Sequence, residues 1–155
     1  MACSRRNLLV NGGFQRGIAP WRGNRIRRLK NPLRSGDYSI FMSAVRTGTG
    51  AVLYQTIDGP FEKECAYYLY FRLLNGTPPE SRTGFYAAVT CLDRNGKMIR
   101  TTHMIIKPPY QTTDWYSYFT IIPPFPRGTA MVSVVFLLEN GSLFVDYVRL
   151  ASHDI

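Results

Sequence analysis

The sequence has little of what helices, metal centres and most active sites need. Ala, Glu and Lys, the residues that favour helices, are scarce, so amphipathic helices are not expected. The two histidines, His103 and His153, stand apart, and no Cys-x-x-Cys spacing occurs, so a zinc site is not expected. Carboxylates are few, and the chain lacks a phosphate-binding glycine loop and a nucleophile motif. We therefore expect no enzyme.

The three cysteines are an odd number, which gives no self-contained disulfide framework. Cys65 and Cys91 fall in apolar segments, where we expect buried thiols. Cys3 lies near the N-terminus, where a bridge to another chain is the alternative to a free thiol.

Long hydrophobic runs are also missing. Only Leu8–Val10 follow the first basic residues, too few for a secretion signal, and no run is long enough to cross a membrane. We expect no membrane association. A protein acting at a surface would arrive there without a classical signal, or with one that this sequence does not include; a cytoplasmic location stays open.

Negative charge is scarce in one part of the chain. Residues 1–46 contain ten Lys or Arg and one acid, which accounts for the whole net charge of +9. The densest stretch is Arg22–Arg34, which could attract phosphate, an anionic sugar or an acidic partner. The alternative is a solvated edge strand, since cationic side chains keep sheet edges from pairing. Nucleic-acid binding has weak support, because only Trp21 accompanies the arginines.

What the chain does have is short apolar runs separated by turn residues. Ten Tyr and nine Phe suit pleated, half-buried strands. We predict strands near residues 7–10, 25–30, 38–43, 51–57, 65–74, 84–93, 98–106, 116–122, 130–138 and 143–150. Asp93–Lys97 contains Asn-Gly, which predicts a hairpin with a type I′ turn. The pattern indicates an all-β, two-sheet antiparallel sandwich over residues 7–150, with tails at 1–6 and 151–155.

Alternation within the strands assigns side chains to faces. Cys65, Tyr67, Leu69, Phe71 and Leu73 should face the core, as should the set from Phe85 to Cys91. The outward positions hold aromatic and polar side chains, which are the groups that stack on sugar rings and bind hydroxyls. The predicted ligand-binding residues, all on one sheet face or its rim, are Tyr54, Tyr68, Tyr70, Arg72, Tyr86 and Trp115.

Several segments together resemble galactose-binding-like jelly rolls, which include xylan- and glucan-binding modules. Residues 7–15 with Trp21 resemble the opening "NLLxNGGFE…W", and residues 35–40 resemble "SGxYSL". Residues 54–57 and 67–71 resemble "xQxI…YxLxF", and Leu143–Leu150 resembles "xxVDDVxL". The resemblance spans residues 7–150 and implies a jelly roll, with Phe14 and Trp21 in the core.

A closer resemblance lies in the middle of the chain. Phe71–Leu74, Thr77–Pro79 and Val89–Asp93 are similar to NTTRR-F1, a jelly-roll domain of Firmicutes found beside collagen-like repeats in spore-surface proteins. This resemblance implies a location at a spore or cell surface. The NTTRR-F1 domain has no established activity. The Gly-X-Y repeat itself does not occur in this sequence.

The wider resemblance also implies a structural calcium between the first turn and the last strand. The matching positions are Asp146, Gln15 and Gly36, but Gln15 replaces a Glu and Tyr147 replaces a second Asp. Losing a carboxylate weakens a calcium site without abolishing it. The alternative is that Asp146 binds backbone amides and joins the chain ends.

Two functions follow from these expectations. One is a non-catalytic module that binds a polysaccharide through the aromatic face. The other is a structural domain of a spore or cell-surface layer, in which the same face binds protein subunits and forms a homo-oligomer, because tyrosine is favoured at interfaces as well.

Overall fold

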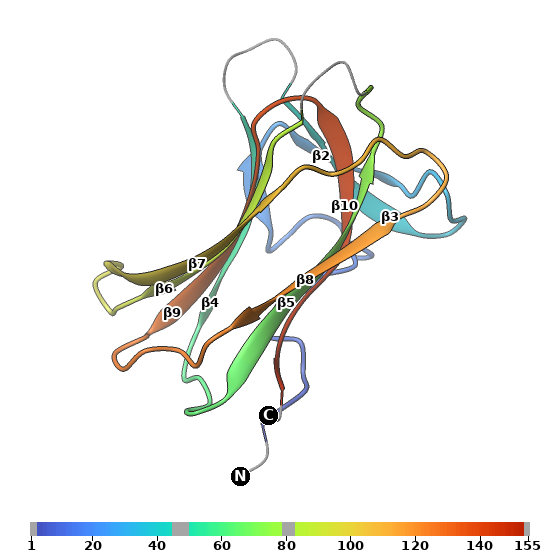
Figure 1. Cartoon of the computed structure of the whole chain (residues 1–155). Coiled ribbons are helices and arrows are strands. Elements are labelled where there is room, and N and C mark those ends of the chain that lie inside the picture. Colours follow the sequence, from blue (N-terminus) through green and yellow to red (C-terminus); the bar gives the residue numbers. More distant parts are fainter. Residues whose placement is uncertain (1–2, 45–49, 79–82, 154–155) are drawn as a thin grey trace.

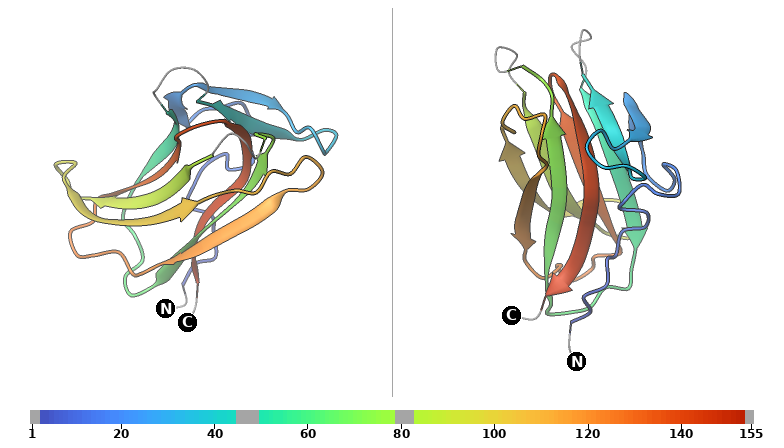
Figure 2. Two further views of the ribbon diagram at one scale, coloured as in Figure 1. Left: turned by 45° about the horizontal axis from the view of Figure 1, so that its top comes forward. Right: turned by 90° about the vertical axis from the view of Figure 1, so that its right-hand side faces the viewer.

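The computed structural model describes residues 3–44, 50–78 and 83–153, which form an all-β sandwich of ten strands. Two antiparallel five-stranded sheets face each other (Figures 1 and 2). Sheet A contains, in spatial order, β1 (Arg22–Asn24), β4 (Ala51–Asp58), β9 (Met131–Leu138), β6 (Phe85–Leu92) and β7 (Met98–Ile106). Sheet B contains β2 (Ile26–Lys30), β3 (Tyr38–Ser43), β10 (Ser142–His153), β5 (Ala66–Asn75) and β8 (Tyr116–Ile122). The predicted fold is confirmed.

Period-two alternation places the core where it was expected. The inward side chains of β5 and β6 are buried, and they meet in one cluster between the sheets. Trp21 and Phe14 lie in that cluster, and the Trp21 ring contacts Phe136 of β9 with centroids 6.3 Å apart. The described part of the chain contains no helix long and apolar enough to span a membrane.

Residues 7–10 were predicted as a strand but do not form one, although they lie beside β10, where a strand could pair. Leu8 donates its amide to the Leu150 carbonyl at 2.7 Å. The Gln55 side chain then accepts from the Val10 amide and donates to the Val10 carbonyl, at 2.8 and 2.9 Å. Because the Gln55 side chain binds both the amide and the carbonyl of Val10, these backbone groups do not pair with a neighbouring strand. The first and last segments nevertheless lie side by side, as predicted.

The last strand is longer and less regular than expected. β10 continues to His153, so residues 151–153 belong to sheet B and not to a tail. A bulge between Asp146 and Arg149 interrupts its pairing with β5, and Tyr147 has a φ of 53°. The extra residue lets Val145 and Val148 both enter the core.

A disulfide joins Cys3 to Cys65, which corrects the expectation of a buried Cys65 thiol and an unpaired or intermolecular Cys3. The N-terminal segment follows β10 toward the start of β5, where Ala66 pairs with His153. Cys65 precedes the start of β5, which lies beside the end of β10, and the N-terminal segment brings Cys3 to the same place. Both termini lie at this end of the sandwich (Figure 1). Cys91 is a free, buried thiol as predicted, and burial raises its pKa.

The hairpin at residues 93–97 is confirmed, but its turn type is not. A type I′ turn needs positive φ at both central residues, and Gly96 has it (77°) whereas Asn95 does not. The Asp93 carboxylate accepts from the amides of Asn95 and Lys97, at 2.8 and 2.9 Å. This Asx turn holds a type I geometry followed by a left-handed Gly96.

The basic stretch Arg22–Arg34 contributes an edge strand to each sheet. β1, which was not predicted, is the edge of sheet A, and β2 is the edge of sheet B. Arg25, with a φ of 59°, connects the two. The prediction that this stretch lies at a sheet edge is thus confirmed. Two of its arginines are structural, because Arg28 donates to the Phe14 carbonyl and Arg34 to the Tyr147 hydroxyl.

Candidate functional site

The predicted aromatic face is divided between the two sheets, which is a correction. Tyr54 and Tyr86 lie on the outer face of sheet A, whereas Tyr68, Tyr70 and Arg72 lie on the outer face of sheet B. Alternation shows which residues of a strand point outward, but it does not show to which sheet the strand belongs. In this fold β5 belongs to one sheet, and β4 and β6, the strands before and after it, belong to the other.

The outer face of sheet A is concave. Strands β6, β7 and β9 bend along their length, and their ends at the lower left of Figure 1 turn away from sheet B. In the register of this sheet Tyr54 is aligned with Val135 and Ala88, and Tyr86 is aligned with Leu137. One strand and an offset of two residues separate the two tyrosines, which places their backbones about 12 Å apart. Between them the face has an apolar floor.

Polar groups lie around that floor. The Tyr86 hydroxyl donates to Glu139 Oε2 at 3.0 Å, and this bond and the carboxylate charge raise the pKa of Tyr86. Arg22 of β1 is the direct cross-strand partner of Tyr54. On the other side a row of small hydroxyls crosses the sheet, made by Thr56, Ser133, Thr90 and Thr101.

The outer face of sheet B is different, because its polar atoms already bind one another. The Tyr70 hydroxyl accepts from Arg72 Nε at 2.8 Å and lies 2.9 Å from Ser117 Oγ. Arg149 Nε donates to the Tyr68 hydroxyl at 2.9 Å. The remaining side chains at the β8 edge are apolar and exposed; Phe119 is 64% and Ile121 65% exposed.

Trp115 lies in the loop before β8 and joins two loops of sheet B. Its Nε1 donates to Asn31 Oδ1 at 3.3 Å, and Asn31 in turn donates to Asp37 at 3.2 Å. Trp115 therefore belongs to the sheet B side and is not at the rim of the face that carries Tyr54 and Tyr86.

The predicted metal residues lie around two neighbouring carboxyl groups, the buried Asp146 and the half-buried Asp37. Asp146 is 0% exposed, and its Oδ2 has no hydrogen-bond partner. Gln15 donates to Asp37, and Gly36 precedes Asp37 in the same turn. Sequence reasoning missed Asp37, because it considered only positions that match the family motif.

The two carboxyl groups differ in their hydrogen bonding. Asp37 accepts from the Tyr147 hydroxyl at 2.7 Å, the Tyr38 amide at 3.0 Å, Asn31 and Gln15. Burial pushes the pKa of Asp37 upward, but these bonds together hold it below its usual value. Burial raises the pKa of Asp146 to about 8; the bond from the Tyr147 amide opposes this rise, and Asp37 adds to it.

These residues fit a bound cation. A buried carboxyl oxygen without a donor, beside a second carboxylate, requires either a proton or a positive ion. Calcium prefers oxygen ligands and gains affinity from carboxylate charge. Asp146 Oδ2 and the Asp37 carboxylate are oxygens of this kind, whereas Gln15 presents its Nε2 to Asp37.

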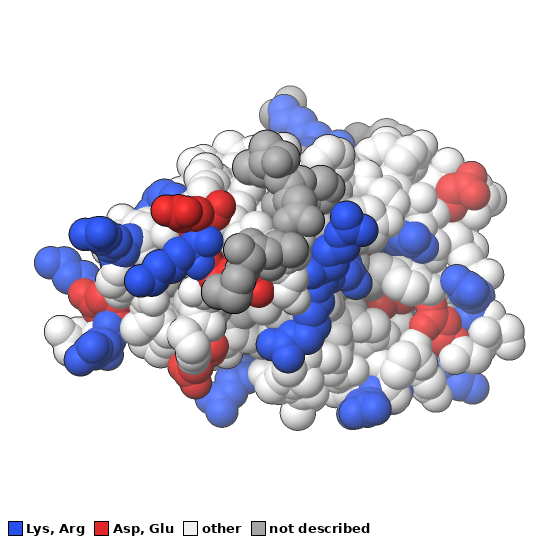
Figure 3. Space-filling view, turned by 90° about the horizontal axis from the view of Figure 1, so that it is seen from below, with Lys and Arg blue, Asp and Glu red and all other residues white. Residues whose placement is uncertain are grey.

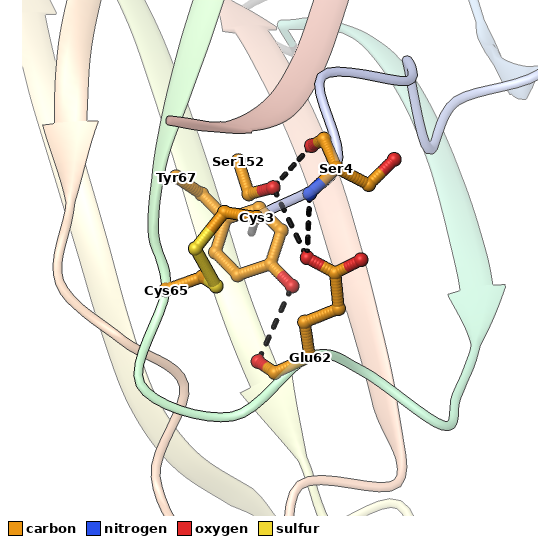
Figure 4. Close-up of a disulfide and its surroundings, with 6 residues drawn as sticks. All are labelled: Cys3, Ser4, Glu62, Cys65, Tyr67 and Ser152. Carbon is orange, nitrogen blue, oxygen red and sulfur yellow. Dashed lines mark hydrogen bonds between the residues drawn. A yellow bond between two sulfur atoms is a disulfide. The ribbon is translucent and has the colours of Figure 1, made fainter. Parts of the chain in front are cut away.

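A second group of possible metal ligands surrounds the disulfide (Figure 4). Ligand atoms of Cys3, Glu62 and Cys65 lie within 4.8 Å of one another. The two sulfur atoms bond to each other, however, and Glu62 Oε2 accepts from the Ser4 amide at 2.8 Å. This cluster fastens the N-terminal segment and is not a zinc site in the oxidised protein.

Solved structures of other proteins share this fold. No protein-family model and no curated protein matches the sequence. Among solved structures, TmCBM61 in complex with β-1,4-galactotriose matches with a TM-score of 0.65 at 18% identity, covering 96% of this chain and 99% of that one. The chain has the fold of a carbohydrate-binding module. The CBM22-2 xylan-binding domain of Paenibacillus barcinonensis Xyn10C is also similar, with a TM-score of 0.62 at 12% identity and coverage of 92% and 98%.

The same fold also occurs as part of larger proteins. The enzymatically active domain of tailspike protein 4 of bacteriophage CBA120 matches with a TM-score of 0.75 at 19% identity over 95% of this chain. This chain spans 21% of that protein's length. At these identities the likeness shows the fold, and function has to be argued from the side chains.

Proposed function

We propose that this protein is a non-catalytic carbohydrate-binding domain that holds a glycan on the concave face of sheet A. The observation that carries the proposal is the pair Tyr54 and Tyr86, which project from the outer face of sheet A on either side of Val135 and Leu137. Concave, mostly apolar surfaces with a few polar groups are the usual form of ligand sites. Two similar structures support it, since one contains β-1,4-galactotriose and the other is described as xylan-binding.

Both tyrosines would contribute to binding the glycan. Each ring offers an apolar face for a sugar, while hydroxyl groups on the sheet bind sugar hydroxyls. Because β9 lies between their strands, the rings suit an oligosaccharide better than a single sugar. The Glu139 carboxylate fixes the Tyr86 hydroxyl at 3.0 Å and so orients that ring.

The two described carboxylates on this face, Asp58 and Glu139, are too far apart for glycoside hydrolysis. Asp58 pairs with Met131 at one end of β9, and Glu139 follows Leu138 at the other end. Along the strand this is a separation of about 25 Å. Glycosidases hold their two carboxyl groups within about 10 Å. The face therefore suits binding without cleavage.

Calorimetry against a panel of soluble glycans tests the proposal. We expect Tyr54→Ala and Tyr86→Ala each to weaken binding about tenfold, because an aromatic contact contributes on the order of 1 kcal/mol beyond the area that it buries. Tyr70→Ala, on the opposite sheet, is the matched control and should bind like the wild type. Binding that is lost in Tyr70→Ala but kept in the other two would move the site to sheet B. No binding to any glycan would overturn the function.

A second function, self-association, is favoured by the edge strand β8. Of the four sheet edges, β1, β2 and β7 carry Arg or Lys, and β8 carries neither. Charged edges resist pairing, and uncharged apolar edges invite it. In an antiparallel β8–β8 pair of two copies, each cationic β2 edge would lie at a far end of the joined sheet. We propose a second copy of this chain as the partner.

Sedimentation equilibrium tests this association. The wild type should form a dimer, and Ile121→Lys should be monomeric. The control is Ile105→Lys, an isoleucine with the same exposure of 65% on the β7 edge, which should remain dimeric. A monomeric wild type at millimolar concentration would refute the association, and so would an Ile121→Lys variant that still dimerises.

Two further proposals concern the environment of the protein. We propose that Ca²⁺ binds between Asp146 and Asp37, beside Gln15, and that the protein acts at a spore or cell surface. The Cys3–Cys65 disulfide supports the location, since such bonds persist in oxidising surroundings. Added Ca²⁺ should raise the melting temperature of the EDTA-treated protein but not that of Asp146→Ala. Equal shifts in both proteins would refute the metal site.

A further inference from the structure

Arg22 lies at the edge of the concave face, beside one of its two tyrosines. It is the direct cross-strand partner of Tyr54, so both side chains project from the same face of sheet A. Arg22 is exposed, and its guanidinium makes no hydrogen bond or ion pair with any described residue. An arginine in this position is a permanent, uncompensated positive charge next to the proposed glycan site.

The arginines nearby divide into structural and free ones. Arg28 is fixed by the Phe14 carbonyl at 2.6 Å and by the Tyr38 ring at 3.6 Å, and Arg34 is fixed by Tyr147. Arg27 and Lys30, by contrast, are exposed and have no partner among the described residues. Folding therefore does not require the charge on Arg22, Arg27 or Lys30.

Among the described residues, no Asp or Glu pairs with Arg22 on the concave face. Asp58 lies at the far end of β4, beyond Thr56, and Glu139 is engaged by Tyr86. At the end of the molecule that carries the termini, in contrast, Asp and Glu lie among the Lys and Arg side chains (Figure 3). Positive charge is thus unopposed beside Tyr54, while it is partly offset at the terminal end.

We infer that the glycan bound by this face is acidic, a polysaccharide that carries carboxylate or sulfate groups. The inference rests on the proposed function. Arginine binds such groups through two parallel, charge-assisted hydrogen bonds. A sugar stacked on Tyr54 would bring its acidic substituent to Arg22, so the ring contact and the ion pair act on the same sugar unit. A neutral glycan would leave this arginine without a role.

Binding measured against matched polysaccharides tests the inference. The probes are polygalacturonate and its methyl-esterified form, which share a backbone and differ in charge, together with alginate, heparin, galactan and xylan. We expect the acidic probes to bind more tightly than the neutral ones, with affinity falling as salt rises. Arg22→Gln should weaken the acidic binding about tenfold, the usual size of a charge-assisted contact.

Arg27→Gln is the control, because it removes the same charge from the same segment but lies on the sheet B side, opposite Phe41. It should change affinity less than threefold or so, through the long-range field alone. Neutral probes that bind as tightly as acidic ones would overturn the inference and leave the proposed function intact. Equal losses in Arg22→Gln and Arg27→Gln would overturn the role of Arg22. Failure of every probe to bind would overturn both.

Discussion

Gly12 and Val148 lie in direct backbone contact. The Val148 amide donates to the Gly12 carbonyl at 3.0 Å, and a Cβ at Gly12 would lie 2.1 Å from the Val148 carbonyl oxygen. Gly12→Ala should therefore push the N-terminal segment off β10 and lower the free energy of unfolding by about 2 kcal/mol or more. Denaturant titration measures this loss.

The adjacent glycine provides the control for that prediction. A Cβ at Gly13 would meet only the Gln15 Cγ, at 3.9 Å, which is ordinary contact. Gly13→Ala should stay within about 0.5 kcal/mol of the wild type. Similar losses in the two variants would contradict the view that backbone approach decides the effect.

The disulfide should contribute substantially to stability. Cys3 and Cys65 are 62 residues apart, and in the loop-entropy account a closed loop of this length is worth about 4 kcal/mol. Cys3→Ser should lower the unfolding free energy of the oxidised protein by that order, and a reducing agent should have little further effect on it. Cys91→Ser is the comparison, since it keeps the bridge and should still respond to the reducing agent. A thiol assay on the denatured, oxidised wild type should find one free thiol per chain.

The buried Asp146 should make stability depend on pH when metal is removed. Its pKa is raised from 3.8 to about 8 in the folded protein, so the folded state binds more protons than the unfolded state between these values. In EDTA the unfolding free energy should therefore fall as pH rises from about 5 to about 8. Asp146→Asn, which carries no proton to lose, should have a smaller slope.

Asp37 does not produce this slope. The pKa of Asp37 is lowered, so its contribution is lost only as pH falls below about 4, outside this interval. Denaturant titrations of wild type and Asp146→Asn at both pH values give the comparison. Equal slopes in the two proteins would show that Asp146 does not carry the effect.

The turn at Asp93–Lys97 gives a local test of backbone geometry. Gly96 has a φ of 77°, so Gly96→Ala should cost about 1 kcal/mol. Gly76 has open space around its Cβ position and no positive φ, so Gly76→Ala should be neutral. Thermal unfolding of the two variants distinguishes them, and an equal effect would contradict the turn assignment.

Some features of this protein could be predicted because they depend on near neighbours in the chain. β3, β7 and β8 begin and end at the predicted residues, since each is an apolar run bounded by turn residues. The side chains of β5 from Tyr67 to Leu73 alternate between core and outer face as the pleat requires. The segment 7–10 was predicted as a strand because its own composition does not reveal that Gln55 replaces its ladder partner.

The amino-acid pattern by itself determined where most strands form and which side chains they bury, and the resemblance to jelly rolls implied that the two ends of the chain meet. Only the tertiary structure decided that Tyr54 and Tyr86 share one face while Tyr70 lies on the other, that Cys3 reaches Cys65, and that Asp37 lies beside Asp146. The physical reason is that alternation has a period of two residues and carries no information about sheet membership. That membership follows from which strands pair across long stretches of sequence, and those pairings bring together residues that no local pattern connects.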